Sequence, residues 1–256
     1  MSALDMFSLT GKKGFITGAA RGIGKCLATA FAELGASLAI VDMDIAEATK
    51  TAKEISDKFS VQTIAIQCNV TDEADVTQMM SQFIAAFGTI DFAINNAGIA
   101  NVIAAEEISS PDFKKVVDVN LNGVFLTAQA AAKQMIKEGK AGTIVNTASM
   151  SGHVINTPQT IANYCASKGG VLLLTKALAV EWAKYNIRVN SVSPGYMATE
   201  LVAEMKNMHE GWISKIPAGR LGNPADLVGA YLYLISDASR YTTGTDLIVD
   251  GGYTSL

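Results

Sequence analysis

The feature that most constrains the fold is an alternation of short apolar runs with longer segments of helical spacing. In the first half of the chain the apolar runs, which we expect to be strands, are Lys13–Thr17, Ser37–Val41, Val61–Gln67 and Ile90–Ile94. The segments between them, which we expect to be helices, are Lys25–Leu34, Ile45–Phe59 and Asp72–Phe87. Strands that alternate with helices of this length are typical of a parallel sheet with helices on both faces. The pattern therefore predicts an α/β fold.

The second half continues the alternation, with further strands expected at Gly142–Ala148, Arg188–Val192 and Asp246–Asp250. Ser110 and Pro111 form a helix start, with serine at the N-cap and proline in the first turn, and this helix should run to about Glu138. We expect later helices from Tyr164 to about Tyr185 and from Asn223 to about Ile235, and a mobile helical lid over Tyr196–Ile216. No repeat, low-complexity tract or linker interrupts the pattern, so residues 1–256 should form a single domain.

Composition narrows the class of protein. With 256 residues, 49% hydrophobic residues and 22 glycines, the chain suits one compact domain with tight turns. A net charge of −4 argues against nucleic acid as a partner. The first residues lack the apolar core of a signal peptide, and no later run approaches transmembrane length. Cys26, Cys68 and Cys165 show no metal or redox spacing, so we expect reduced thiols and a cytoplasmic protein.

A glycine-rich segment, Thr17-Gly-Ala-Ala-Arg-Gly-Ile-Gly24, lies between the first expected strand and helix. Glycines in this setting allow a tight turn and the approach of a pyrophosphate to the helix N-terminus, although such a turn can also be purely structural. The next strand ends in Asp42, an acid placed to accept hydrogen bonds from adenosine ribose hydroxyls and to repel a 2′-phosphate. Arg21 is the opposing signal, because a guanidinium could bind that phosphate. We give Asp42 more weight and predict NAD, with NADP less favoured.

Tyr164 and Lys168 are four residues apart, so they lie on one face of a helix. A tyrosine hydroxyl has a pKa near ~10, and lowering it to about 7 takes roughly 4 kcal/mol of differential stabilisation, much of which a desolvated ammonium could supply. Ser149 follows an expected strand at its C-terminal end, where open α/β sheets carry their chemistry. A Tyr-x-x-x-Lys pair alone is usually a solvated helical pair. Its specificity comes from the order of glycine-rich turn, serine and pair.

From about Phe7 to Tyr253 the chain resembles the short-chain dehydrogenase/reductase family. The matching motifs, in order, are Thr17-Gly-x-x-x-Gly-Ile-Gly24, Asn95-Asn-Ala-Gly98, Asn120, Ser149, Tyr164-x-x-x-Lys168 and Pro194-Gly195. The resemblance implies a Rossmann-type, doubly wound parallel sheet of about seven strands with helices on both faces. It also implies a homotetramer, to which the small residues of the Tyr164 helix and the long helix from Pro111 would contribute.

The resemblance assigns catalytic roles by position. Tyr164 is the general acid/base, and Ser149 stabilises charge on the same substrate oxygen. Lys168 lowers the tyrosine pKa and holds the nicotinamide ribose. Asn120 anchors a water in a proton relay, although its amide could instead brace the backbone. The implied cofactor contacts are Gly18, Arg21, Gly22, Ile23, Gly24, Asp42, Asn69, Val70, Asn96, Gly98, Tyr164, Lys168, Pro194, Gly195 and Thr199.

Two features depart from the common family pattern. Asn69 stands where an aspartate usually contacts the adenine amino group, and an amide oxygen could accept the same bond. The interval from Ser149 to Tyr164 is longer than in many relatives, and its sequence is similar to that of polyol dehydrogenases acting on galactitol, sorbitol or sorbose. Asn156 is the favoured substrate contact there, although it could brace the loop. The substrate contacts we expect are Ser149, His153, Asn156, Gln159 and Tyr164, with His153 at least as well explained as a surface histidine.

The leading interpretation is an NAD-dependent dehydrogenase that interconverts a polyol and its ketose. The alternative is a carbonyl reductase for another oxo compound, such as a 3-oxoacyl thioester or an oxo sugar acid like ketogluconate. A dinucleotide sensor without activity is disfavoured, because a sensor need not keep Ser149, Tyr164, Lys168 and Asn120. A metal-dependent dehydrogenase is also disfavoured, since the chain has just two histidines, His153 and His209, and no cysteine cluster. We therefore predict no metal site.

Overall fold

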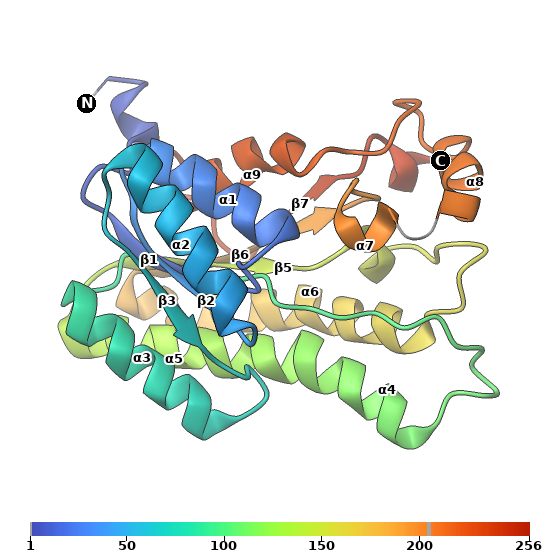
Figure 1. Ribbon diagram of the computed structural model, residues 1–256, viewed down its shortest axis with the longest axis horizontal. Helices are drawn as coiled ribbons and strands as arrows, with labels where there is room; N and C mark the ends of the chain where they lie inside the picture. The colour runs from blue at the N-terminus through green and yellow to red at the C-terminus, as the bar shows by residue number, and fades with distance from the viewer. Residues whose placement is uncertain (1, 204–205) are drawn as a thin grey trace.

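A computed structural model describes residues 2–203 and 206–256. Its strands form one sheet in which every pair of neighbours is parallel, in the order β3-β2-β1-β4-β5-β6-β7 (Figure 1). The parallel sheet and the predicted seven strands are confirmed. The strands are β1 Lys13–Thr17, β2 Ser37–Asp42, β3 Thr63–Gln67, β4 Phe92–Asn95, β5 Gly142–Thr147, β6 Ile187–Pro194 and β7 Asp246–Val249.

The order of the strands reverses beside β1. The chain builds outward from β1 to β3, returns to place β4 on the other side of β1, and then builds outward to β7. Ile16 of β1 accordingly pairs with Ile40 of β2 and with Ile94 of β4. In open α/β sheets this reversal leaves a crevice at the carboxyl ends of the strands, which is where ligands bind.

Two layers of helices sandwich the sheet (Figure 1). One face is covered by α1 Gly22–Glu33, α2 Ile45–Phe59 and α9 Val228–Ile235. The other is covered by α3 Glu73–Phe87, α5 Gly123–Glu138 and α6 Ala162–Trp182, with α4 Ser110–Val117 extending the line of α5. The short helices α7 Glu200–Ala203 and α8 Lys206–Ile213 lie beyond the sheet. The 3-10 turns are Asp5–Phe7, Met150–Gly152, Ala183–Tyr185, Pro224–Leu227, Asp237–Ser239 and Tyr253–Ser255.

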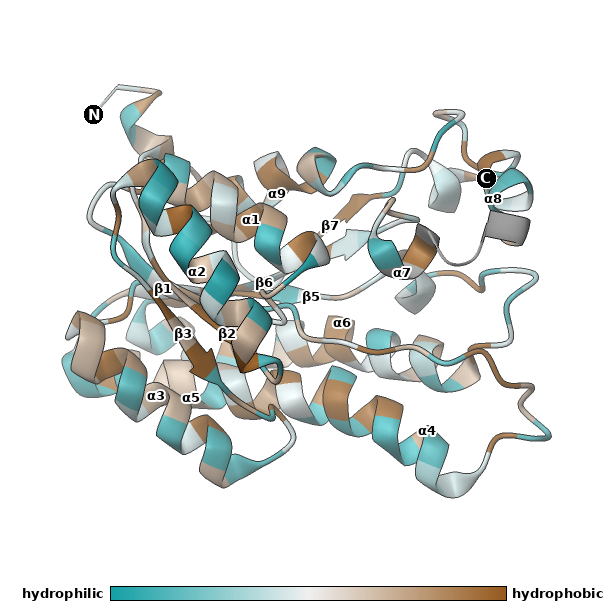
Figure 2. Ribbon diagram, viewed as in Figure 1, coloured by the Kyte–Doolittle hydropathy of each residue, from teal (hydrophilic) through white to brown (hydrophobic). Residues whose placement is uncertain are grey.

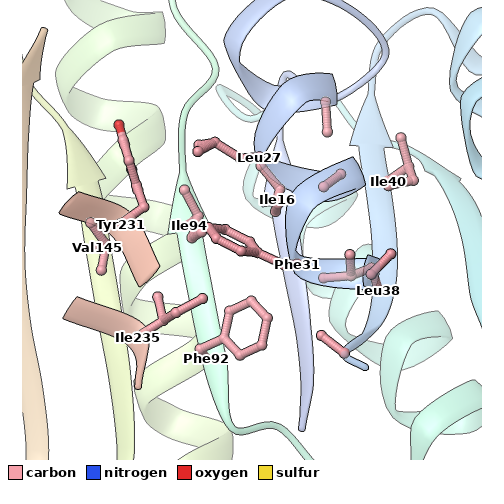
Figure 3. Packing of buried hydrophobic residues seen from close by; sticks show 14 of the residues in the cluster. Ile16, Leu27, Phe31, Leu38, Ile40, Phe92, Ile94, Val145, Tyr231 and Ile235 are labelled. Atoms are coloured by element: carbon pink, nitrogen blue, oxygen red, sulfur yellow. The ribbon is translucent and has the colours of Figure 1, made fainter. Parts of the chain in front are cut away.

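Each face of the sheet has its own buried core. On the α1 and α9 face, Phe31 packs edge-to-face on Phe92 with ring centroids 6.4 Å apart, beside Tyr231 and Ile235 (Figure 3). On the opposite face Phe15 and Phe83 pack edge-to-face at 5.9 Å. In Figure 2 helices α2 and α3 alternate teal and brown along their length, as expected of helices with one apolar face. Burial on both sides explains why the strands are continuously apolar.

The predicted helix from Ser110 to Glu138 differs from the structure in two ways. The N-cap is Ser109, whose hydroxyl accepts a hydrogen bond from the Asp112 amide at 3.2 Å, so Ser110 is already the first helical residue. The helix is also interrupted by a π-helical turn over Asp118–Asn122, which carries Asn120. Such π-helical turns are frequent at functional sites.

The predicted lid over Tyr196–Ile216 is not one helix. It contains α7 and α8, and residues 204–205 of the predicted span lie outside the described residues. The predicted helix from Asn223 begins with a 3-10 turn, for which Asn223 and Asp226 form a capping box, and then continues as α9. Within the part of the chain that the structure describes, no helix combines the length and apolarity needed to cross a bilayer.

Candidate active site

The carboxyl ends of the strands border two adjoining cavities. One, which we call the tyrosine cavity, is lined by Ser149, Asn156, Gln159, Tyr164 and Lys168 among others. The second, the glycine cavity, is lined by the glycine-rich turn, Asp42, Asn69 and Val70. The two adjoin because both are lined by Ile23, Asn96, Gly98, Ile99 and Thr199. Most of the predicted catalytic and cofactor residues thus meet in one continuous site, whereas Asn120 and Gly24 line neither cavity.

The glycines of the turn between β1 and α1 serve different purposes. A Cβ on Gly18 would lie 2.8 Å from the Ala97 Cα, and one on Gly24 would lie 2.3 Å from the Gly18 carbonyl oxygen, so both positions are needed for close packing. Gly22 has a φ of +58°, and the nearest atom to a Cβ there would be Thr199 Cγ2, at 3.9 Å. Gly22 therefore provides the conformation and the open space that a ligand's approach requires.

The N-terminus of α1 suits a phosphate. Its N-cap residue, Arg21, makes no side-chain capping hydrogen bond, and its first turn carries no acidic residue. Gly22 and Ile23, the first helical residues, line the glycine cavity. Backbone N–H groups at an uncapped helix start, together with the helix dipole, favour an anionic group. The observed backbone therefore fits the pyrophosphate of a dinucleotide.

Asp42 ends β2 and lines the glycine cavity. Its carboxylate accepts hydrogen bonds from the Ala20 amide and from the Asp44 amide, both at 3.1 Å, which fixes it beside the turn. Arg21 is drawn away into an ion pair, with Nη2 2.6 Å from Asp44 Oδ2. The acid is therefore held in place, while the predicted opposing cation already has a partner.

Asn69 and Val70 also line the glycine cavity, where the adenine is expected. The Asn69 Oδ1 accepts two hydrogen bonds from Thr71, from its amide at 3.1 Å and from its hydroxyl at 2.9 Å. An adenine amino group would have to compete for that oxygen, so the predicted bond is weaker than an aspartate's. Val70 packs under Gly123, where an added Cβ would lie 2.7 Å from Val70 Cγ2.

Asn96 and Gly98 lie where the two cavities meet. The Asn96 Nδ2 donates to the carbonyl oxygens of Thr17 and Gly18, both at 3.1 Å, and so braces the glycine-rich turn from below. A Cβ on Gly98 would lie 3.3 Å from Asn120 Oδ1 and 3.6 Å from Lys168 Nζ. Gly98 therefore allows the loop after β4 to approach both polar groups. Pro194, Gly195 and Thr199 line the tyrosine cavity, as predicted for the nicotinamide half.

The buried Asn120 side chain ties the loop after β4 to α6. Its Oδ1 accepts from the Ile99 amide at 2.8 Å, and its Nδ2 donates to the Ile99 carbonyl at 2.9 Å and to the Ser167 hydroxyl at 3.1 Å. Both amide hydrogens are used in these bonds. The side chain thus braces the backbone, as its alternative interpretation anticipated, and a relay water at Asn120 stays a prediction.

Lys168 is buried, and its Nζ donates to the Thr147 carbonyl at 2.7 Å, 5.7 Å from the centre of the Tyr164 ring. Burial lowers the pKa of Lys168 to about 8. Burial also raises the pKa of Tyr164 above its usual value, although a hydrogen bond with Ser149 acts in the opposite direction. Desolvation of the phenolate thus dominates in the folded chain, and a lowering of the Tyr164 pKa by Lys168 together with a bound nicotinamide stays a prediction.

Ser149 begins the segment of residues 149–163, which we call the substrate loop. Its hydroxyl accepts from the Ser151 amide at 3.1 Å and donates to the Ser151 hydroxyl, also at 3.1 Å. It caps the 3-10 turn Met150–Gly152, and this turn holds it at the wall of the tyrosine cavity. The local turn thus fixes the serine against the hydroxyl of Tyr164, where one substrate oxygen could meet both groups.

The substrate loop brings two of its three predicted polar residues to the tyrosine cavity, Asn156 and Gln159. The prediction for His153 needs correction. Its Nε2 lies 2.9 Å from Asp246 Oδ2 and 3.3 Å from the Ser193 hydroxyl, and His153 does not line the tyrosine cavity. The hydrogen bond to the half-buried carboxylate of Asp246, on β7, explains this placement. His153 therefore anchors the loop to the sheet edge.

Two aromatic residues of the tyrosine cavity, Tyr196 and Trp212, were missing from the sequence prediction. Their rings stack with centroids 4.3 Å apart at 12°. Tyr196 could have been expected, since it follows Pro194-Gly195 directly. Nothing in the pattern of the lid distinguishes Trp212 from a surface residue. Lys115, an exposed residue that lines the glycine cavity, was also not predicted.

The sequence matches a family model described as enoyl-(acyl carrier protein) reductase over residues 18–254. The chain belongs to the short-chain dehydrogenase/reductase family. Members similar to it include a sorbose reductase of Schizosaccharomyces pombe, 46% identical over 98% of this chain and 99% of the relative. An NADP-dependent mannitol dehydrogenase of Hypocrea jecorina is 43% identical over 98% and 96%. A galactitol 2-dehydrogenase (L-tagatose-forming) of Cereibacter sphaeroides is 39% identical over 99% of both chains.

Solved structures of short-chain dehydrogenases share this fold. One from Mycobacterium marinum is 49% identical, with a TM-score of 0.97 and full coverage of both chains. A gluconate 5-dehydrogenase from Burkholderia cenocepacia in complex with NADP and tartrate is 38% identical, with a TM-score of 0.94 and full coverage. The predicted Rossmann-type fold and family are confirmed, and the chain is an oxidoreductase that acts on CH–OH groups with a nicotinamide cofactor.

Proposed function

We propose that this chain is a one-domain dehydrogenase that interconverts a secondary alcohol of a polyol and the corresponding ketose. The observation that carries the proposal is the tyrosine cavity, which combines Ser149, Tyr164 and Lys168 with the fixed amides of Asn156 and Gln159. A substrate with several hydroxyls needs polar partners beyond the reacting pair, and these amides supply them. Relatives named for sorbose, mannitol and galactitol support the same substrate class.

In the proposed reaction, Ser149 and Tyr164 bind the oxygen of the reacting carbon. A bound nicotinamide supplies the hydride acceptor or donor. During alcohol oxidation the phenolate oxygen of Tyr164 takes the hydroxyl proton, and during ketone reduction the neutral phenol returns it. Ser149 stabilises the charge that develops on the same oxygen. The Lys168 ammonium, buried and held by the Thr147 carbonyl, favours the phenolate form when this proton is moving.

We further propose NAD as the preferred cofactor. Asp42 is held by two backbone amides at the cavity wall, and Arg21 is engaged by Asp44. A carboxylate in this position accepts hydrogen bonds from a ribose and repels a 2′-phosphate. Several relatives are named for NADP instead. Comparing kcat/KM with NAD and with NADP therefore tests this proposal directly.

The proposed function is tested by a panel of mannitol, sorbitol, galactitol, D-fructose, L-sorbose and L-tagatose, assayed with NAD(H) and NADP(H) at the absorbance band of the reduced cofactor. We expect at least one polyol and its ketose to react, because the cavity presents fixed polar partners. Activity confined to 3-oxoacyl thioesters or to ketogluconate would transfer the assignment to the alternative carbonyl reductases. No activity on either set would contradict both.

We propose a homotetramer assembled partly through α4, α5 and α6. These helices leave apolar side chains exposed, including Leu173 at 70% and Val180 at 80%. Light scattering at micromolar concentration should give four times the 26.9 kDa of one chain. Leu173→Lys combined with Val180→Lys should reduce that mass, and Leu4→Lys, at another exposed leucine, should not. A monomeric wild type would contradict the proposal.

We place the protein in the cytoplasm, without a nucleic-acid or membrane partner. The placement is supported by Cys26, Cys68 and Cys165, all of which are free thiols. Burial raises the pKa of Cys68 to about 12, so its thiol stays neutral at the wall of the glycine cavity. Fractionation of cells that express the chain would test this location.

A further inference from the structure

A chain of hydrogen bonds joins the lid to the substrate loop along the wall of the tyrosine cavity. The Trp212 Nε1 donates to Gln159 Oε1 at 3.1 Å, and the Tyr196 hydroxyl donates to the same oxygen at 2.8 Å. The Asn156 Nδ2 in turn donates to the Tyr196 hydroxyl at 3.2 Å. All four residues line the tyrosine cavity, so the direction of these bonds decides what the cavity offers to a substrate.

The indole of Trp212 fixes that direction. An indole N–H can only donate, so the atom of Gln159 that faces it must be the carbonyl oxygen. The Tyr196 hydroxyl shares that oxygen and therefore uses its single hydrogen there. It must accept from its other neighbour, which makes Asn156 turn its Nδ2 toward it. The Trp212 indole, which cannot exchange donor for acceptor, thus sets the orientation of the Gln159 amide and, through Tyr196, that of the Asn156 amide.

The orientation leaves one atom without a partner. Asn156 is 2% exposed, and its Oδ1 has no hydrogen-bond partner among the described residues. A buried acceptor that is left unpaired costs free energy, so a ligand group that donates to it is favoured over one that cannot. Asn156 lines the tyrosine cavity, so the atom that its amide keeps for a ligand there is an acceptor and not a donor.

Aromatic packing prevents the indole from turning away. The ring of Trp212 stacks on the ring of Tyr196 at an interplanar angle of 12°. Tyr253 packs edge-on against the same Tyr196 ring, with ring centroids 5.6 Å apart. Trp212 is 1% exposed. Rotating the indole to redirect its N–H would break this stack, so the donor that orders the hydrogen bonds is held rigidly.

We propose that Trp212 is a positioning residue that fixes the hydrogen-bond polarity of the substrate site, so that the site selects substrates carrying a hydroxyl at the carbon next to Asn156. This carbon is not the reacting one, whose oxygen meets Ser149 and Tyr164. The inference rests on the proposed function and specifies it further. A hydroxyl can donate to Asn156 Oδ1, whereas a fluorine, a keto oxygen or a carboxylate can only accept. Oxo sugar acids that place their carboxylate there are rejected.

The test compares the ketose of the panel that the wild type reduces fastest with its monodeoxy-monofluoro analogues, fluorinated in turn at each carbon other than the carbonyl. At one carbon we expect fluorine to lower kcat/KM by about 10- to 100-fold, chiefly through KM, because the acceptor is left unpaired. Trp212→Phe keeps a stacking ring and removes the N–H. Both amides can then reverse, so the penalty should fall to about threefold or less.

The matched control is Trp182→Phe, the same substitution at the chain's other tryptophan, which is partly buried at the end of α6, packs against the core and should keep the full penalty. Asn156→Ala removes the acceptor and should also erase it. If Trp212→Phe fails to fold, Tyr196→Phe provides the same test, because it keeps the stack and frees Asn156 to reverse.

Three outcomes overturn the inference. The first is the absence of a fluorine penalty at every carbon in the wild type. The second is a full penalty retained by folded Trp212→Phe, or by Tyr196→Phe where that variant replaces it. The third is a wild type that turns over no member of the panel. In that case the proposed function fails as well, whereas the first two outcomes occur in an active polyol dehydrogenase and leave the proposed function standing.

Discussion

Replacing Tyr164 with phenylalanine will lower kcat by about 10³-fold or more and leave NADH binding nearly unchanged. The substitution removes the hydroxyl that exchanges the proton with substrate but keeps the ring that lines the tyrosine cavity. General acid–base groups contribute typically about 10²- to 10⁴-fold, and this hydroxyl also binds the substrate oxygen, so the upper part of that range is expected. The measurement is kcat with the best polyol, with NADH affinity followed by cofactor fluorescence.

Tyr185→Phe is the matched control, since Tyr185 is 40% exposed in the 3-10 turn that follows α6 and should keep wild-type kinetics. Substantial residual kcat in Tyr164→Phe would remove this tyrosine from the mechanism. The pH profile gives a second readout. Burial raises the pKa of Tyr164, so the neutral phenol is favoured and the phenolate becomes populated only as pH rises. Oxidation of the alcohol should therefore speed up with rising pH. Ketone reduction, which needs the neutral phenol, should slow over the same range.

The sequence was sufficient to predict the order of strands and helices, because strands buried on both faces leave continuous apolar runs. The sequence was also sufficient to predict that glycines are needed in the turn between β1 and α1. Gly18 and Gly24 each occupy a position where a Cβ would collide with backbone. The residues predicted to be catalytic meet in one cavity, because their spacing places Tyr164 and Lys168 on one face of α6 and Ser149 follows a strand that ends at the same edge. Each of these features is local, so the spacing of residues along the chain is enough to predict how they are arranged.

What the sequence could not provide depends on contacts between distant segments. His153 was expected near the substrate but turns to Asp246, which lies 93 residues later in the chain. Trp212 was unremarkable within the lid, and its importance appears only when the fold brings it to Gln159. The pKa of Tyr164 is another case, since the spacing to Lys168 suggests a lowered value while burial of the folded site raises it.

The second large effect concerns the cofactor. Wild-type enzyme should prefer NAD to NADP in kcat/KM, and Asp42→Ser should shift that preference toward NADP by about 100-fold. Asp42 lines the glycine cavity, where we propose that the adenosine ribose binds, and removing its charge removes the repulsion of a 2′-phosphate. Each tenfold change in preference corresponds to about 1.4 kcal/mol. Part of the shift should come from lost binding of NAD, because the carboxylate can no longer accept from the ribose hydroxyls.

Asp42 also accepts bonds from the amides of Ala20 and Asp44, so a second variant must separate charge from shape. Asp42→Asn keeps the size and one acceptor oxygen but loses the charge, and it should reproduce most of the shift. Asp57→Ser, at an exposed aspartate of α2 paired with Lys53, should leave cofactor preference unchanged.

Asp44→Ser releases Arg21 from its ion pair and should strengthen NADP binding in the Asp42→Ser background. If the wild type itself prefers NADP, as several relatives are named for doing, then Arg21 leaves Asp44 for the 2′-phosphate and outweighs Asp42.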